Sequence, residues 1–178
     1  MLIDESGFML QPLLRRTWAP RGQTPVIRSW DRHDRLTAIT ALALTPARRR
    51  CNLFFQLLDH NAKSEDFFSF IIMLHREIPH PLTIVWDRLS AHRKAARWFF
   101  ELGCGWLRFV YLPPYCPELN PVEHVWSSTK WGRLANWPAP NIDAVSDRVS
   151  DDLQWQATQQ RVPVSYTHLT LPTMIIRC

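Results

Sequence analysis

Three acidic residues stand where apolar segments of the sequence end or begin. Asp4 follows the apolar residues 1–3, Asp87 follows the apolar run 82–86, and Glu123 lies at the start of a later helical pattern. Carboxylate oxygens are hard ligands that suit Mg²⁺ or Mn²⁺. Two such ions held close together can activate water or a 3′-hydroxyl and stabilise the leaving oxygen of a phosphodiester. The three acids therefore predict a two-metal site for phosphodiester chemistry.

Each acid also has a purely structural interpretation. Asp4 could be a turn residue, Asp87 could cap the following helix, and Glu123 stands where a capping-box glutamate after Asn120 belongs. These alternatives are favoured for each residue alone. As a set, carboxylates at the ends of apolar strands are costly unless a cation neutralises them, which favours the metal site.

The elements that must position these acids alternate in a recognisable way. The expected strands are residues 1–4, 36–44, 51–58, 82–86 and 106–111, and the expected helices are 64–78, 90–102, one that starts at Asn120–Pro121, and 141–160. Ser64 is expected to cap the first helix and Gly103 to close the second, and 82–86 is expected to be covered on both faces. Three successive strands followed by strand–helix alternation predict an α/β fold, a mixed sheet with helices on both faces.

Composition places these elements in one soluble domain. The chain has 178 residues, of which 46% are hydrophobic, and contains no apolar run long enough to cross a bilayer. The N-terminus lacks the features of a secretory signal, so export is not expected. Four cysteines form no C-x-x-C pair, which favours reduced thiols in the cytoplasm over a zinc or redox site.

The net charge of +5 rests mainly on arginine, whose planar side chain suits phosphate groups. Arginines cluster at Arg15–Arg16, at Arg28, Arg32 and Arg35, and at Arg48, Arg49 and Arg50. A polyanionic partner is one interpretation, and solvated surface charge is the other. Arg15, Arg16, Arg48, Arg49 and Arg50 are the candidate DNA-binding residues.

The C-terminal segment differs from the rest of the chain. Residues 164–173 resemble the translation of a transposon-end sequencing adaptor, and residues 174–178 continue the same read-through. The alternative is a genuine C-terminal strand, because Thr, Tyr and Leu suit β-structure. We expect a catalytic domain over residues 1–163 and a non-native tail over 164–178, whose removal takes away only the charge of Arg177.

Four sequence blocks carry a family resemblance. Asp4–Phe8, Trp86–His92 and the proline-rich Leu112–Trp126 resemble the three motifs of the bacterial insertion-sequence branch of the mariner transposase superfamily, and Arg16–Pro25 is also similar to that family. Residues 88–122 separate the second and third acids, close to the family spacing. The resemblance covers roughly residues 1–160, and its third block is the most specific.

The resemblance implies a ribonuclease H-like fold with a five-stranded mixed sheet, in which the first and fourth strands are neighbours. It implies two Mg²⁺ or Mn²⁺ ions, with Asp4 bridging both while Asp87 and Glu123 each ligate one. The implied reaction is hydrolysis at transposon ends followed by strand transfer into target DNA. His92 is implied either to contact substrate or to orient Asp87, with a helix-surface histidine as the alternative.

The same resemblance extends to partners and location. The expected partners are the terminal repeats and target DNA, with a homodimer for the full-length protein, no membrane, and a bacterial, nucleoid-associated cytoplasmic location. Arg88 stands where the family often has asparagine and Cys116 where it often has serine; Arg88 and Asn120 are further candidate substrate contacts. Nothing before Met1 supplies a helix-turn-helix domain, so an N-terminally truncated protein is expected.

Three rival functions remain open from the sequence. The chain could be a ribonuclease H-like nuclease that cuts without transposing, a DNA-binding remnant of a transposase without catalysis, or an inactive scaffold. The proline-rich block argues against the nuclease, and the intact acids argue against the remnant. Because the acids repel one another, Asp87→Asn is expected to stabilise the metal-free fold and abolish metal binding.

Overall fold

The structure is a computed structural model that describes residues 1–28, 33–47, 50–114 and 116–159. Arg32, Arg48, Arg49 and the segment 164–178 lie outside these residues. The strands are β1 (Leu2–Met9), β2 (Arg35–Leu44), β3 (Cys51–Leu58), β4 (Leu82–Trp86) and β5 (Leu107–Tyr111). The helices are α1 (Ser64–Glu77), α2 (Ser90–Glu101), α3 (Val122–Ser128) and α4 (Ile142–Thr158), with a 3₁₀ turn η1 (Pro117–Leu119) and a π-helical turn η2 (Thr129–Arg133). The predicted order of strands and helices is confirmed.

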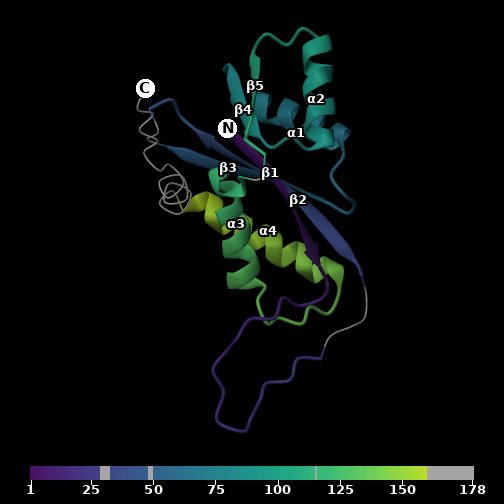
Figure 1. Ribbon diagram of the computed structural model, residues 1–178, viewed down its shortest axis with the longest axis vertical. Helices are drawn as coiled ribbons and strands as arrows, with labels where there is room; N and C mark the ends of the chain where they lie inside the picture. The colour runs from purple at the N-terminus through teal and green to yellow at the C-terminus, as the bar shows by residue number, and fades with distance from the viewer. Residues whose placement is uncertain (29–32, 48–49, 115, 160–178) are drawn as a thin grey trace.

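The strands form one mixed five-stranded sheet in the order β3-β2-β1-β4-β5 (Figure 1). β2 pairs antiparallel with both β1 and β3, whereas β4 pairs parallel with β1 and with β5. In the parallel pair, Leu2 of β1 lies opposite Val85 of β4. Asp4 lies two residues after Leu2, and Asp87 lies two residues after Val85. The register therefore brings these two acids to the same level of the sheet.

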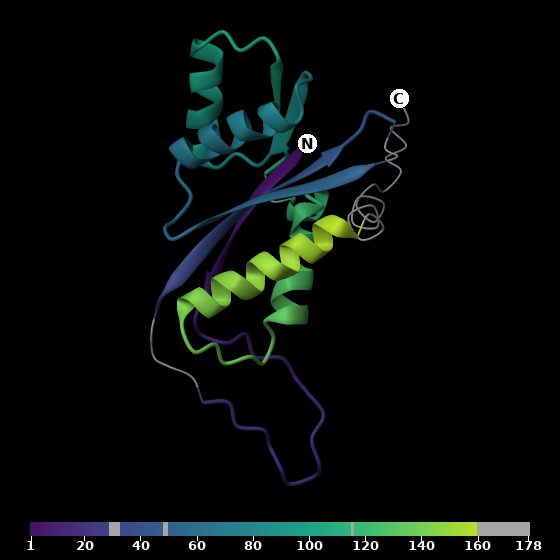
Figure 2. The same ribbon diagram turned by 180° about the vertical axis from the view of Figure 1, so that it is seen from behind.

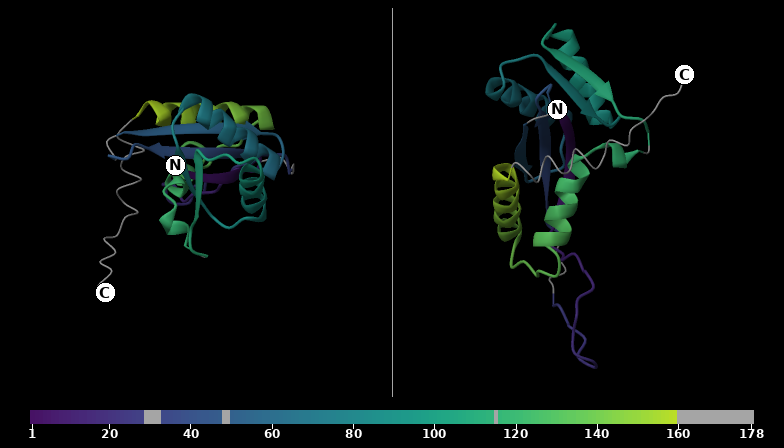
Figure 3. Two further views of the ribbon diagram at one scale, coloured as in Figure 1. Left: turned by 90° about the horizontal axis from the view of Figure 1, so that it is seen from above. Right: turned by 90° about the vertical axis from the view of Figure 1, so that its left-hand side faces the viewer.

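Helices cover the two faces of the sheet with separate apolar cores. On one face α1 and α2 pack over β1 and β4 around residues such as Ile3, Phe67 and Ile84. On the other face α3 and α4 pack over β1 and β2 around Phe8 and Val149. Figures 2 and 3 show α4 running beside α3, and α4 also contacts η2. None of the described helices has the length and hydrophobicity needed to cross a membrane.

The helix ends follow their local sequence. Lys63 is the N-cap of α1, and its backbone N–H donates to the Asp66 carboxylate at 2.8 Å. The expected cap, Ser64, is instead the first helical residue, and the Asp66 carboxylate accepts from the N-cap backbone as in a capping box. Asn141 caps α4 by accepting from the Ala144 N–H at 2.8 Å. The prediction that Gly103 closes α2 fits its φ of 66°, which glycine adopts without strain.

Two expectations about strands were wrong. β1 does not end at Asp4 but continues to Met9, because every residue from Leu2 to Met9 pairs with β2 despite the polar side chains. β4 is an interior strand, yet only one of its faces is covered: Trp86 is buried whereas Thr83 is exposed. Helices α3 and α4 lie over β1, β2 and β3, and this leaves that side of β4 open.

Candidate active site

Asp4 and Asp87 are delivered by neighbouring parallel strands. Asp4 lies within β1, and Asp87 follows the last residue of β4. The indole N–H of Trp126, on α3, donates to Asp4 Oδ2 at 3.0 Å. Asp87 is more open, with 54% of its side chain exposed. Asp4 is therefore half-buried against α3, whereas Asp87 is exposed to solvent.

Glu123 comes from the first turn of α3 and is exposed. The proline-rich turn before it cannot be helical and redirects the chain after β5. Asn120, buried at the end of this turn, donates from its side-chain amide to the Ile3 carbonyl at 3.4 Å and accepts from the Val122 N–H at 3.4 Å. Asn120 thereby fixes the start of α3 against β1, beside Asp4.

A cleft of about 430 Å³ is lined by all three acids. Its other lining residues are Arg88, Leu89, Leu112, Pro113, Pro114, Cys116 and Asn120. The acids do not already form a closed cage: within the part of the chain that the structure describes, no three His, Cys, Asp or Glu side chains are disposed to hold one ion. Like-charged carboxylates repel one another, which agrees with their open arrangement.

Electrostatics single out Asp4. Its pKa rises from 3.8 to about 7, first because burial disfavours the charged form, then because Glu5, Glu123 and Asp87 add negative charge. The hydrogen bond from Trp126 opposes this rise. A cation bound near such a buried carboxylate would stabilise its charged form, and carboxylate oxygens are the donors that Mg²⁺ and Mn²⁺ prefer. The donor set of the cleft therefore fits divalent metal ions.

His92 holds Asp87 and is not accessible. Its ring is fully buried, and Nδ1 lies 2.6 Å from Asp87 Oδ1, which also accepts from the Leu89 N–H at 2.9 Å. Burial lowers the His92 pKa, but Glu5 and Asp87 together outweigh it, so the net shift is upward. Because the ring is fully buried, the helix-surface interpretation is wrong. The contact with Asp87 fits the prediction that His92 orients Asp87, and contact with substrate stays a prediction.

The remaining candidates divide between the cleft and the surface. Arg88 and Asn120 line the cleft, although the Asn120 amide is engaged with the backbone. Arg15 and Arg16 are exposed at the start of the excursion between β1 and β2, which Figure 1 shows leaving the body of the molecule. Arg15 is tied to the Trp131 carbonyl at 2.8 Å. Arg50 is exposed on the β2–β3 loop, and none of these arginines lines the cleft.

Two residues that sequence reasoning missed complete the site. Trp126 binds Asp4, and Lys130 donates from Nζ to Ser6 Oγ at 2.7 Å on the same strand. Burial lowers the Lys130 pKa, while Glu123 and Asp4 act in the opposite direction. The helical spacing of Glu123, Trp126 and Lys130 was the available signal, because positions three, four and seven residues apart share one helix face.

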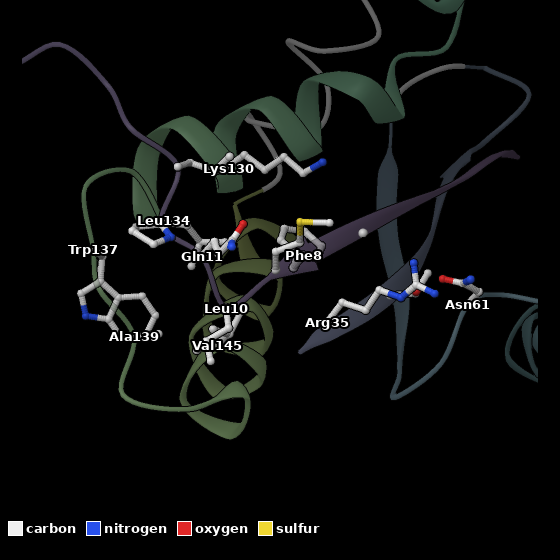
Figure 4. A pocket seen from close by; sticks show the side chains of 15 residues that line it. Phe8, Leu10, Gln11, Arg35, Asn61, Lys130, Leu134, Trp137, Ala139 and Val145 are labelled. Carbon is white, nitrogen blue, oxygen red and sulfur yellow. The ribbon is translucent and has the colours of Figure 1, made fainter. Parts of the chain in front are cut away.

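A second hollow, of about 390 Å³, lies towards the other end of β1 (Figure 4). Phe8, Leu10, Leu134 and Trp137 give it a mainly apolar wall, with Lys130 at its border. No carboxylate lines it. The acidic cleft is therefore the better candidate for a divalent metal site.

A mixed five-stranded sheet of this order, flanked by helices, is a ribonuclease H-like fold, and its cleft carries acids from β1, the end of β4 and α3. The family model for the DDE superfamily endonuclease matches residues 1–146, so the chain belongs to that family. None of the curated proteins compared with the chain matches it significantly.

Solved structures of a mariner transposase share the fold. The Mos1 mariner paired-end complex with Mn has a TM-score of 0.67 and 16% identity, covering 94% of this chain and 51% of that one. The Mos1 paired-end complex with Mg gives 0.63 and 14%, covering 95% and 52%. The Mos1 strand transfer complex gives 0.56 and 14%, covering 95% and 53%. The ribonuclease H-like expectation is confirmed, and the chain spans about half the length of these transposases.

Proposed function

We propose that this chain is the catalytic core of a DNA transposase, in which Asp4, Asp87 and Glu123 hold two Mg²⁺ or Mn²⁺ ions. One observation carries the proposal: three acids from separate elements line a single cleft, and the pKa of the most buried one rises to about 7. Membership of the DDE superfamily endonuclease family supports the same assignment.

The residues of the cleft have distinct tasks in this proposal. The bound cations supply Lewis-acid activation of water or a 3′-hydroxyl and stabilise the leaving oxygen. Asp4, which interacts electrostatically with both other acids, would be shared by the ions, and Trp126 fixes one of its oxygens. Asp87 and Glu123 would each hold one ion. Lys130, whose amine lies near Asp4 and Glu123, contacts the phosphodiester as a positive point charge.

The proposed substrate is DNA. The similar Mos1 structures are paired-end and strand transfer complexes, which supports transposon ends and target DNA as partners here. Exposed Arg15, Arg16 and Arg50 add positive charge outside the cleft and are the proposed DNA-backbone contacts. A homodimer of the full-length protein and a nucleoid-associated location in the bacterial cytoplasm belong to the same proposal.

The test is metal-dependent nicking of supercoiled plasmid DNA by the chain and by two matched variants. Glu123→Gln removes a proposed ligand, whereas Glu118→Gln removes an exposed acid nearby that does not line the cleft. Nicking with Mg²⁺ or Mn²⁺ by the wild type and Glu118→Gln, but not by Glu123→Gln, supports the proposal. Equal nicking by Glu123→Gln contradicts it, and DNA binding without nicking by the wild type favours the non-catalytic remnant instead.

A further inference from the structure

Glu5 lies next to Asp4 in sequence but on the other face of the sheet. Consecutive residues of a strand point to opposite faces, so Asp4 meets Trp126 of α3 while Glu5 turns towards α2. Glu5 adds negative charge near Asp4, but it does not line the cleft, so any positioning of a ligand by Glu5 must pass through another residue.

His92 is placed to make that connection. Its Nε2 lies 3.3 Å from Glu5 Oε2, and its Nδ1 lies 2.6 Å from Asp87 Oδ1. The ring is stacked on Trp86, with centroids 4.5 Å apart and planes at 9°, and meets the edge of Phe67 at 4.3 Å. These aromatic contacts fix the ring plane, so the directions of both nitrogens are set by packing.

Among the described residues, the buried oxygen of the Glu5 carboxylate and the facing nitrogen of His92 lack other hydrogen-bond partners. Glu5 Oε2 and His92 Nε2 are both buried, and neither makes an aligned hydrogen bond to any described group. Buried polar atoms without partners are costly and uncommon, and here the two atoms lie only 3.3 Å apart. The pair is close enough to align with a small adjustment of the Glu5 side chain.

We propose that Glu5 is a positioning residue that acts through His92 to hold Asp87 for cation binding. Asp87 Oδ1 is occupied by His92 and by the Leu89 N–H, and this leaves Oδ2 for the cleft. Because the Asp87 side chain is otherwise half-exposed, these two contacts are what restrict rotation of its carboxylate. Outer residues that orient a ligand commonly change metal affinity when replaced. The inference rests on the proposed metal function of Asp87.

The experiment compares Mn²⁺ affinity, from the paramagnetic resonance signal of free Mn²⁺, in single and double variants of the whole chain. Glu5→Gln and Glu5→Asp are each expected to weaken Mn²⁺ binding about tenfold. Aspartate keeps the negative charge, but its side chain is one methylene shorter and places the carboxylate further from His92. Glu101→Gln, an exposed acid on α2, is the matched control and should bind as the wild type does.

A double-mutant cycle distinguishes positioning from simple charge. His92→Asn keeps a donor near Nδ1 but cannot reach Glu5, so adding Glu5→Gln to it should cause no further loss. The Nε2 nitrogen resonance of His92 should shift in Glu5→Gln, and thermal melting confirms that each variant is folded.

Three results would overturn the inference. One is wild-type affinity in Glu5→Gln. Another is full affinity in Glu5→Asp. The third is the same loss from Glu5→Gln in the His92→Asn background, which would mean that Glu5 acts by its charge near Asp4. Failure of the proposed function looks different, because Asp87→Asn would then bind Mn²⁺ as the wild type does.

Discussion

Replacing Asp4 with asparagine should stabilise the metal-free protein, and only above acidic pH. The folded-state pKa of Asp4 is raised to about 7 from 3.8, first by burial and then by the charges of Glu5, Glu123 and Asp87. The folded state therefore binds a proton that the unfolded chain has released, and stability falls as pH rises through this interval. The loss is absent below pH of about 4 and complete above pH of about 7.

The size of the effect follows from the pKa change. Each pKa unit corresponds to about 1.4 kcal/mol, so the upper limit for Asp4 is about 4 kcal/mol. Asparagine can still accept the Trp126 hydrogen bond through its side-chain oxygen, so that contact is retained. We expect Asp4→Asn to raise the free energy of unfolding by about 2 to 4 kcal/mol at pH 8 and to leave it nearly unchanged at pH 4.

The assay is urea unfolding with a chelator present at pH 4, 5, 6, 7 and 8. Asp147→Asn, which neutralises an exposed acid on α4, is the control and should change stability by less than about 0.5 kcal/mol throughout. In a parallel series without the chelator, added Mn²⁺ should stabilise the wild type but not Asp4→Asn, because only the wild type keeps the ligand. A gain from Asp4→Asn that is equal at pH 4 and pH 8 would refute the electrostatic reasoning.

Three other predictions concern the same face of the sheet. Trp126→Phe removes the hydrogen-bond donor to Asp4. In urea unfolding it should lower the free energy of unfolding by about 1 to 3 kcal/mol at pH 8 and by less at pH 5. An equal loss at both pH values would argue against the hydrogen bond. Lys130→Met should lower the salt dependence of plasmid binding by about one phosphate contact, measured by fluorescence titration, and an unchanged slope counts against phosphate contact. Leu153→Ala, fully buried on α4, should cost about 2 to 5 kcal/mol, and a cost below about 1 would mean that α4 does not complete the core.

The sequence predicted the elements well because their patterns are local. The apolar runs at β3 and β4 and the helical spacing of α4 depend only on residues within each segment. The length of β1 was missed because Glu5, Ser6 and Gly7 do not resemble a strand, and only the partner β2 makes them one. Pairing between distant segments is therefore where local patterns stop being informative.

The acids of the site could be found from their motifs, but their unequal environments could not. The pKa of Asp4 is raised, first because the side chain is buried, whereas Asp87 is half-exposed and contacts His92. The stabilisation expected from Asp87→Asn stays a prediction, and the raised pKa of Asp4 adds a second one, at Asp4. The contact of Glu5 with His92 could not be predicted from the sequence, because it depends on how the distant helix α2 packs against β1.

The most direct test of the proposed site is calorimetric titration of Mn²⁺ into the whole chain and its variants at pH 8. The wild type and Glu118→Gln should bind Mn²⁺ alike, whereas Asp4→Asn, Asp87→Asn and Glu123→Gln should each lose most of the heat of binding. Binding that is unchanged in all three ligand variants would contradict the assignment of Asp4, Asp87 and Glu123 as the metal site.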